Sequence, residues 1–279
     1  DGIANVETAG AVILEAGSGT IGTSTRPFFT DLTNTGSITA RAYGDVHLYE
    51  CTPNSTSADC TTNSTYAYLP GGSAGDMRIK SVFSKSGDIY LKADGSILDA
   101  LGTDLTKIQA RKVYLTAGDG IGTSTDYLEV HTGYSASTPD AGNLTAAALN
   151  SIYIGDADGD MGVRLVISYT GDVGLKALGS ILDAGDVADP TNPNSADATN
   201  SVGGRWPGQN VLGNSIILYA EIGGIGTSAN EMDINSAYSG AGTLTSTSGN
   251  ILNTYIIETD GDLTLFTVQT GSDCYAYIT

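Results

Sequence analysis

The chain has 279 residues, a net charge of −19, an apolar content of 40% and only 15% charged residues. This apolar share excludes a disordered chain, and 12 basic against 31 acidic residues exclude the clustered cations that nucleic acid requires. No run approaches ~18 uninterrupted apolar residues, so no membrane span is expected.

The sequence repeats itself at long intervals. A phrase Ile-Gly-Thr-Ser begins at Ile21 and returns at Ile121 and Ile225, and a second phrase, from 87 to 100, returns from 171 to 184. Such self-similarity predicts a solenoid whose units bury their apolar faces against their neighbours. We expect a single solenoid over 1–279, in three imperfect copies of about 80–105 residues, at about 1–100, 101–204 and 205–279.

An insertion at about 51–72 lengthens the first copy. It holds Cys51 and Cys60, each followed by an Asn-Ser-Thr sequon, at Asn54 and Asn63. In a secreted protein these cysteines are expected to form a disulfide that staples the loop, because a metal site here lacks two further ligands. The candidate glycosylation sites, usable only in a host that glycosylates, are Asn54, Asn63 and Asn143.

Short alternating segments predict strands rather than helices. Apolar and polar residues alternate in 89–93, 113–117, 173–177 and 263–267, which places the apolar set of each on one face. Strands of successive coils would stack in parallel about 4.8 Å apart. Without its insertions the repeat is expected to hold about four coils of ~21 residues.

Gly-Asp pairs precede several of these strands. Six such pairs are Gly44-Asp45, Gly75-Asp76, Gly87-Asp88, Gly159-Asp160, Gly171-Asp172 and Gly261-Asp262. We expect the glycine to supply a positive φ, and the aspartate to accept a hydrogen bond from the backbone two residues on. The pairs therefore predict tight turns that launch the next strand.

The densest acidic cluster is Asp156, Asp158 and Asp160. Carboxylates at this spacing are candidate ligands for Ca²⁺, which takes six to eight oxygen ligands. The loop is not an EF-hand, because its twelfth position is Ile167 rather than Glu. The alternative is an acidic solvated turn, and no other cofactor is expected.

A second insertion, at about 186–209, is rich in Pro, Asn, Asp and Ser. It contains Arg205 and the single tryptophan, Trp206, while the first insertion contains Tyr66 and Tyr68. Trp, Tyr and Arg dominate binding hot spots, and loops that leave a rigid scaffold are frequent recognition sites. These four side chains are candidate contact residues, and the alternative is a pair of solvated bulges.

The phrases G-D-I-Y-L-K-A-x-G-S-I-L-D-A and L-T-A-G-x-G-I-G-T resemble the repeats of giant filamentous-haemagglutinin-like exoproteins of bacteria. The resemblance covers the chain outside the two insertions. It implies an all-β fold, a right-handed parallel β-helix (β-solenoid) shaft with two loop insertions, and an extracellular or cell-surface location. It also implies a role in adhesion or surface structure, and it is specific for the repeat type rather than for one task.

Catalytic motifs are scarce. His47 and His131 lie in strand-like alternation, and no Gly-x-Ser-x-Gly elbow or His-Glu-x-x-His motif occurs. Both ends fall within a repeat, and the partner of Cys274 is not assigned. We therefore expect a non-enzymatic extracellular shaft, filament or adhesin segment of a larger repetitive protein, with neighbouring repeats, copies of itself, glycans or host and cell surfaces as partners.

Two other functions stay open at this point. The first is a carbohydrate-active β-helix enzyme of the polysaccharide lyase or hydrolase type, because paired carboxylates can cleave polysaccharides. The second is a self-assembling fibre subunit whose open ends stack on other copies. A cleft rimmed by charged residues would favour the enzyme, and long uniform filaments would favour the fibre.

Overall fold

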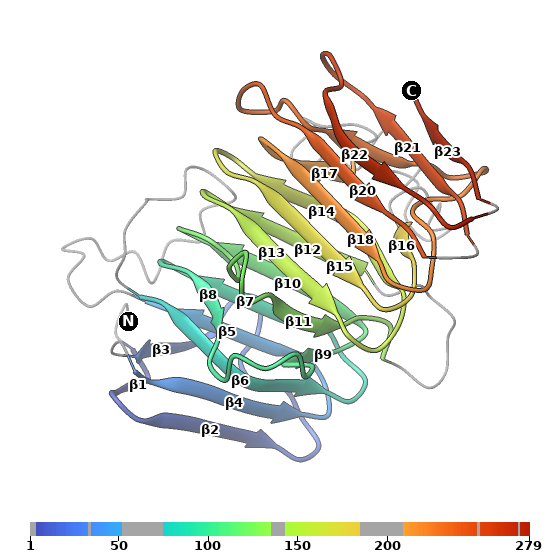
Figure 1. Cartoon of the computed structure of the whole chain (residues 1–279). Coiled ribbons are helices and arrows are strands. Elements are labelled where there is room, and N and C mark those ends of the chain that lie inside the picture. The colour runs from blue at the N-terminus through green and yellow to red at the C-terminus, as the bar shows by residue number, and fades with distance from the viewer. Residues whose placement is uncertain are drawn as a thin grey trace.

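A computed structural model describes residues 4–32, 35–51, 75–134, 143–184, 209–249, 252–272 and 274–279. Within these ranges the chain forms strands and turns, and it contains no helix that could span a membrane. The strands form two sheets, the first of 12 strands and the second of 11, which face each other as stacked ladders (Figure 1).

The first sheet contains β1 (Val6–Thr8), β3 (Phe28–Leu32), β5 (Val46–Glu50), β7 (Ile89–Ala93), β10 (Lys112–Ala117), β12 (Asn143–Ala148), β14 (Met161–Ser168), β16 (Ile181–Asp183), β17 (Val211–Leu212), β19 (Met232–Asn235), β21 (Thr254–Glu258) and β23 (Ala276–Ile278). The second contains β2 (Ala11–Ala16), β4 (Ser37–Ala42), β6 (Met77–Ser84), β8 (Ile97–Asp99), β9 (Ile108–Gln109), β11 (Leu128–His131), β13 (Ile152–Asp156), β15 (Val173–Ala177), β18 (Ile216–Ala220), β20 (Leu244–Thr247) and β22 (Leu265–Gln269).

The chain winds as a parallel β-solenoid. Successive strands alternate between the sheets, and each strand pairs in parallel with a strand of the next coil, as Val46, Ile89 and Val113 show by stacking in register. The all-β parallel fold predicted from the sequence is thus confirmed. The right-handed sense stays a prediction.

The core lies between the two sheets. In β7, Ile89, Leu91 and Ala93 are buried, while Tyr90 and Lys92 alternate with them on the outer face. The inward side chains of successive coils form one apolar cluster that extends from Val12 to Ile256. Since each aliphatic side chain lies over another, stability is distributed along the stack rather than concentrated at one site.

Three of the four predicted strand segments match β7, β10 and β15 to within one residue. The fourth, predicted at 263–267, is β22, which begins two residues later. The register between β20 and β22 shifts between Leu244 and Thr245, where Phe266 is skipped in the pairing. Because of this bulge, the paired residues of β22 lie two positions after the segment that the apolar and polar alternation predicted.

The three Ile-Gly phrases adopt one local structure. Gly22, Gly122 and Gly226 all have a positive φ, of 66°, 59° and 60°. A Cβ on Gly122 would lie 2.2 Å from the carbonyl oxygen of Tyr153, so only glycine fits there. The phrase therefore forms a tight outward loop between an isolated inward isoleucine and the strand that follows it.

The repeat contains an odd number of strand positions. We call each strand position in a sheet a rung. Both β8 and β9 pair with β6, so they share one rung. Likewise, β16 and β17 both pair with β14 and share another. Counting from β3 to β11, and again from β11 to β19, gives seven rungs, or three and a half coils rather than about four. Equivalent strands therefore lie in opposite sheets, and successive copies are related by half a turn.

The turns confirm one expectation only in part. Of the six quoted Gly-Asp pairs, Gly75 and Gly261 have the predicted positive φ, of 90° and 88°, and the other four glycines do not. The aspartates bond the next coil instead of their own turn: Asp45 Oδ1 accepts from the Asp88 amide at 2.9 Å, and Asp172 Oδ1 accepts from the Ser215 amide at 3.0 Å. A Cβ on Gly87 would lie 2.5 Å from the Asp45 backbone nitrogen, so the glycine permits close stacking of coils.

Candidate functional site

Each copy of the repeat ends one strand with an acid, which is buried in the first two copies and half-buried in the third. Glu50, Asp156 and Glu258 are the last residues of β5, β13 and β21, which are equivalent strands. We call this set the carboxylate clamp. In the first copy, Glu50 accepts hydrogen bonds from Thr30 Oγ1 and from the Leu32 amide, both at 2.5 Å. The clamp thus ties one coil to the coil before it.

The clamp is complete in two copies and incomplete in the second. Glu258 accepts from the Ser236 amide at 3.0 Å and from its hydroxyl at 2.7 Å, but Asp156 is one methylene shorter. Asp156 Oδ1 lies 3.4 Å from His131 Nδ1, while the buried Asp156 Oδ2 and Thr132 Oγ1 have no hydrogen-bond partner among the described residues. Asp156, a predicted calcium ligand, therefore occupies in the second copy the structural position of Glu50.

The three candidate calcium ligands are not gathered into one group. Asp158 accepts from the Thr106 hydroxyl, and Asp160 Oδ1 accepts from the Ser180 amide at 2.6 Å. The part of the chain that the structure describes contains no group of three His, Cys, Asp or Glu side chains placed to hold a metal ion. The aspartates instead connect β13 and its following turn to neighbouring coils.

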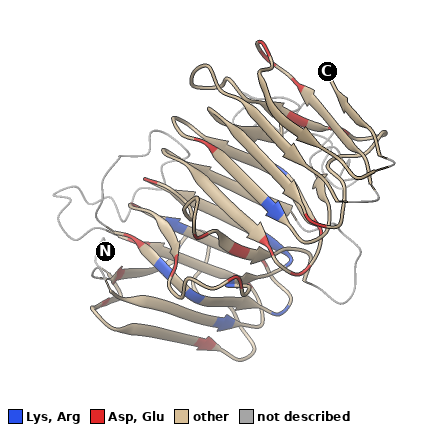
Figure 2. Ribbon diagram, in the orientation of Figure 1, with Lys and Arg blue, Asp and Glu red and all other residues tan. Residues whose placement is uncertain are grey.

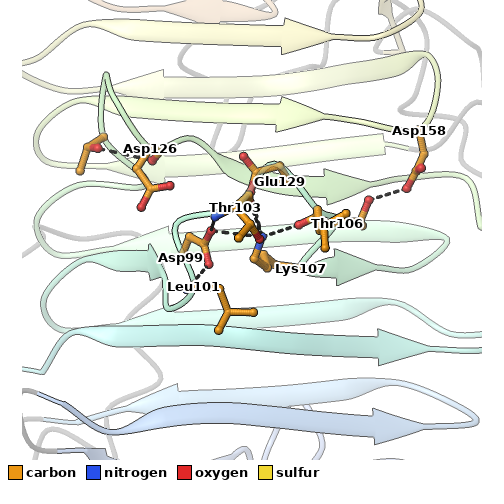
Figure 3. Close-up of polar contacts among 10 residues, drawn as sticks. Asp99, Leu101, Thr103, Thr106, Lys107, Asp126, Glu129 and Asp158 are labelled. Atoms are coloured by element: carbon orange, nitrogen blue, oxygen red, sulfur yellow. Dashed lines mark hydrogen bonds and ion pairs between the residues drawn. The ribbon is translucent and has the colours of Figure 1, made fainter.

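Lys107 forms a buried ionic cluster at the junction of β8 and β9 (Figure 3). Its ammonium lies 3.1 Å from Asp99 Oδ2 and 3.4 Å from Glu129 Oε2, and it donates to the carbonyl of Thr103 at 2.5 Å. Asp99 also accepts from the Leu101 amide at 2.6 Å. These bonds hold the outward loop of residues 100–107, which the sequence analysis did not anticipate.

Burial limits what this cluster can do chemically. Lys107 is only 2% exposed and Glu129 only 4%. Burial raises the pKa of Glu129 to about 7, which outweighs the opposing attraction of Lys107. Burial likewise raises the pKa of Glu50 to about 7. Such values suit a general acid or base, but neither carboxyl faces solvent, so the structure supports a stabilising role for both.

Aromatic rings stack in a row on the outer face of the first sheet. The ring centroids of His47 and Tyr90 lie 4.3 Å apart and those of Tyr90 and Tyr114 lie 4.5 Å apart, with 2° between the planes in both pairs. We call these three residues the ring ladder. Burial lowers the pKa of His47, which favours the neutral imidazole in the stack. In-register stacking of β5, β7 and β10 places these rings face to face, so that their edges line the outer face of the sheet.

Charged side chains flank the ring ladder. Arg111 donates two hydrogen bonds to Asp88, at 2.9 and 3.0 Å. The Lys92 ammonium lies 4.5 Å from the ring centroid of Tyr49 on the neighbouring outward column. The ladder was missed in the sequence because its members are 43 and 24 residues apart, although they are direct register partners on β5, β7 and β10.

The remaining predicted site residues have mixed outcomes. Cys51 is buried at the end of the first sheet's β5, and Cys274 is a free thiol in the described part of the chain. Asn143 is the partly exposed first residue of β12. Those that lie outside the described residues are Cys60, Asn54, Asn63, Tyr66, Tyr68, Arg205 and Trp206, together with nearly all of both insertions.

The fold and these clusters define a two-sheeted parallel β-solenoid with internally paired ionic groups and a ring ladder on one outer face. No family model, curated protein or solved structure matches the chain.

Proposed function

We propose that this chain is a non-enzymatic shaft segment of an extracellular or cell-surface adhesin. The observation that carries the proposal is the ring ladder: three stacked rings held in register on a rigid parallel stack. The ring edges and hydroxyl groups of this fixed row offer contact groups at low conformational cost. Several such contacts along one shaft can sum to useful avidity even when each is weak.

The buried acids support the non-enzymatic part of the proposal. The two carboxyls with pKa values of about 7, Glu50 and Glu129, are enclosed by neighbouring coils and bonded to them. A polysaccharide-cleaving pair would have to reach a sugar in solvent. These acids instead stabilise the stack.

Binding to immobilised glycans and to cell surfaces tests the adhesive role. We expect the double variant Tyr90→Ser/Tyr114→Ser to lose at least about tenfold in binding. Its matched control is Tyr255→Ser/Tyr277→Ser, which removes another stacked pair of the same sheet, with 5.1 Å between centroids. Equal binding by the ladder variant and the wild type, or turnover of a polysaccharide by the wild type, would contradict the proposal.

A further inference from the structure

A depression lies on the outer face of the second sheet, at the carboxyl ends of β2, β4 and β6. Its volume is about 540 Å³, within the range of small-ligand sites. Figure 2 shows basic residues on β4, on β6 and in the turn after β6, near an acidic segment at the end of β2. The side chains that line it are Glu15, Arg41, Tyr43, Phe83, Lys85 and Tyr134.

Strand register builds the depression from two adjacent columns. Glu15, Arg41 and Phe83 are direct partners on β2, β4 and β6. Tyr43 and Lys85 follow in the turns, one residue beyond the end of β4 and of β6. An acid, two cations and aromatic rings therefore face one opening, although up to 70 residues separate them in sequence.

The two cations are held by aromatic rings rather than by acids. The Arg41 guanidinium lies 5.3 Å from the Phe83 ring centroid, and the Lys85 ammonium lies 5.5 Å from the Tyr43 centroid. Among the described residues, neither cation forms an ion pair. In a chain with a net charge of −19, two basic side chains therefore lie beside one opening, with Glu15 as the register neighbour of Arg41.

The opening itself depends on Gly17. A Cβ built on Gly17 meets nothing within 4 Å, and its column neighbour Tyr43 is 49% exposed. Tyr134, 38% exposed, closes the opposite wall, with its ring edge against Phe83 at 5.3 Å between centroids. A side chain at position 17 would therefore fill the depression without disturbing the backbone.

We propose that this depression binds a carboxylate-bearing sugar, a uronic acid residue of an acidic polysaccharide. Arg41 and Lys85 bind the carboxylate, since a guanidinium pairs with it through two parallel hydrogen bonds. Glu15 accepts hydrogen bonds from the sugar hydroxyls. The apolar C–H face of the ring packs on the exposed faces of Tyr43 and Tyr134. This inference deepens the proposed adhesive role by naming a ligand class at a second surface.

Titration of the full chain with sodium glucuronate, followed by NMR or calorimetry, tests the assignment. We expect saturable binding at about 1 mM and none with glucose. Arg41→Gln and Lys85→Gln are each expected to weaken binding about tenfold, and Gly17→Leu is expected to abolish it by filling the space. The matched control is Lys176→Gln, which removes a cation lying 5.8 Å above Tyr219 on the same sheet, away from the depression.

Each other outcome overturns the inference. If glucose and glucuronate bound with equal affinity, the depression would not recognise the carboxylate. If equimolar sulfate competed with glucuronate, the depression would be a general anion site. If Gly17→Leu bound glucuronate as tightly as the wild type and had the same melting temperature, the ligand would bind at another site. The ladder variant is expected to lose cell-surface binding but to keep glucuronate binding, because its substitutions lie on the other sheet. Failure of the adhesive role and failure of this site can therefore be told apart.

Discussion

Glu50 and Asp156 occupy equivalent positions in successive copies, yet one clamp is complete and the other is not. Glu50 reaches both the Thr30 hydroxyl and the Leu32 amide of the coil before it. Asp156 lacks one methylene, and one of its oxygens and the Thr132 hydroxyl have no partner in the part of the chain that the structure describes. A solenoid tolerates such a local defect because its stability is a sum of interfaces between neighbouring coils.

The largest expected effect is removal of the complete clamp. Glu50→Ala leaves a buried hydroxyl and a buried amide unpaired, and we expect it to lower the free energy of unfolding by about 3 kcal/mol. Asp156→Ala loses only its contacts with His131 and the Asp158 amide, so about 1–2 kcal/mol is expected. Urea unfolding measures both, and equal losses would contradict the comparison.

The pH dependence of stability tests the buried carboxyl directly. The pKa of Glu50 is about 7 in the folded chain against 4.5 for an ordinary glutamate, so the folded state holds this proton more tightly. Its contribution is complete below about pH 4.5 and is lost as pH rises through 7.

The pKa of Glu129 is also raised, to about 7, so its contribution to stability is lost over the same pH range. We therefore expect the melting temperature to fall between pH 5 and pH 8, and Glu50→Gln to flatten this slope. Glu15→Gln, at an exposed site, controls for the change in net charge. If melting temperature depended on pH equally in Glu50→Gln and in the wild type, a titrating group other than Glu50 would cause the dependence.

Lengthening the short acid should repair the second clamp. Asp156→Glu adds the missing methylene, which brings the carboxylate toward Thr132, and a gain of about 1 kcal/mol in unfolding free energy is expected. Glu50→Asp is the reciprocal variant and should lose stability. If both variants are destabilised equally, the length of the side chain is not the cause of the defect.

The smallest effect concerns two buried hydroxyls, that of Thr30 in β3 and that of Thr132 directly after β11. Thr30→Val removes a donor to Glu50 and is expected to cost about 1 kcal/mol. Thr132→Val removes a buried hydroxyl that has no partner, so it should be neutral or slightly stabilising. Thermal unfolding of the two variants, measured together, decides this point.

Much of the scaffold could be predicted from local pattern. Alternation within 89–93, 113–117 and 173–177 identified β7, β10 and β15, because strand faces follow a two-residue period. The recurring Ile-Gly phrase indicated a repeating turn. The ring ladder and the depression could not be predicted in the same way, since their residues meet only through the register between coils.

The sequence by itself determined that the chain is a parallel stack of short strands, because two-residue alternation and repeated phrases are local properties. Only the tertiary structure decided that each copy turns by half a coil, that Asp45 and Asp172 bond the next coil, and that Asp156 ends β13 at the position that Glu50 occupies in β5. The physical reason is distance along the chain. Contacts between residues about 20 to 45 positions apart depend on loop lengths and bulges, which set the register of the whole stack.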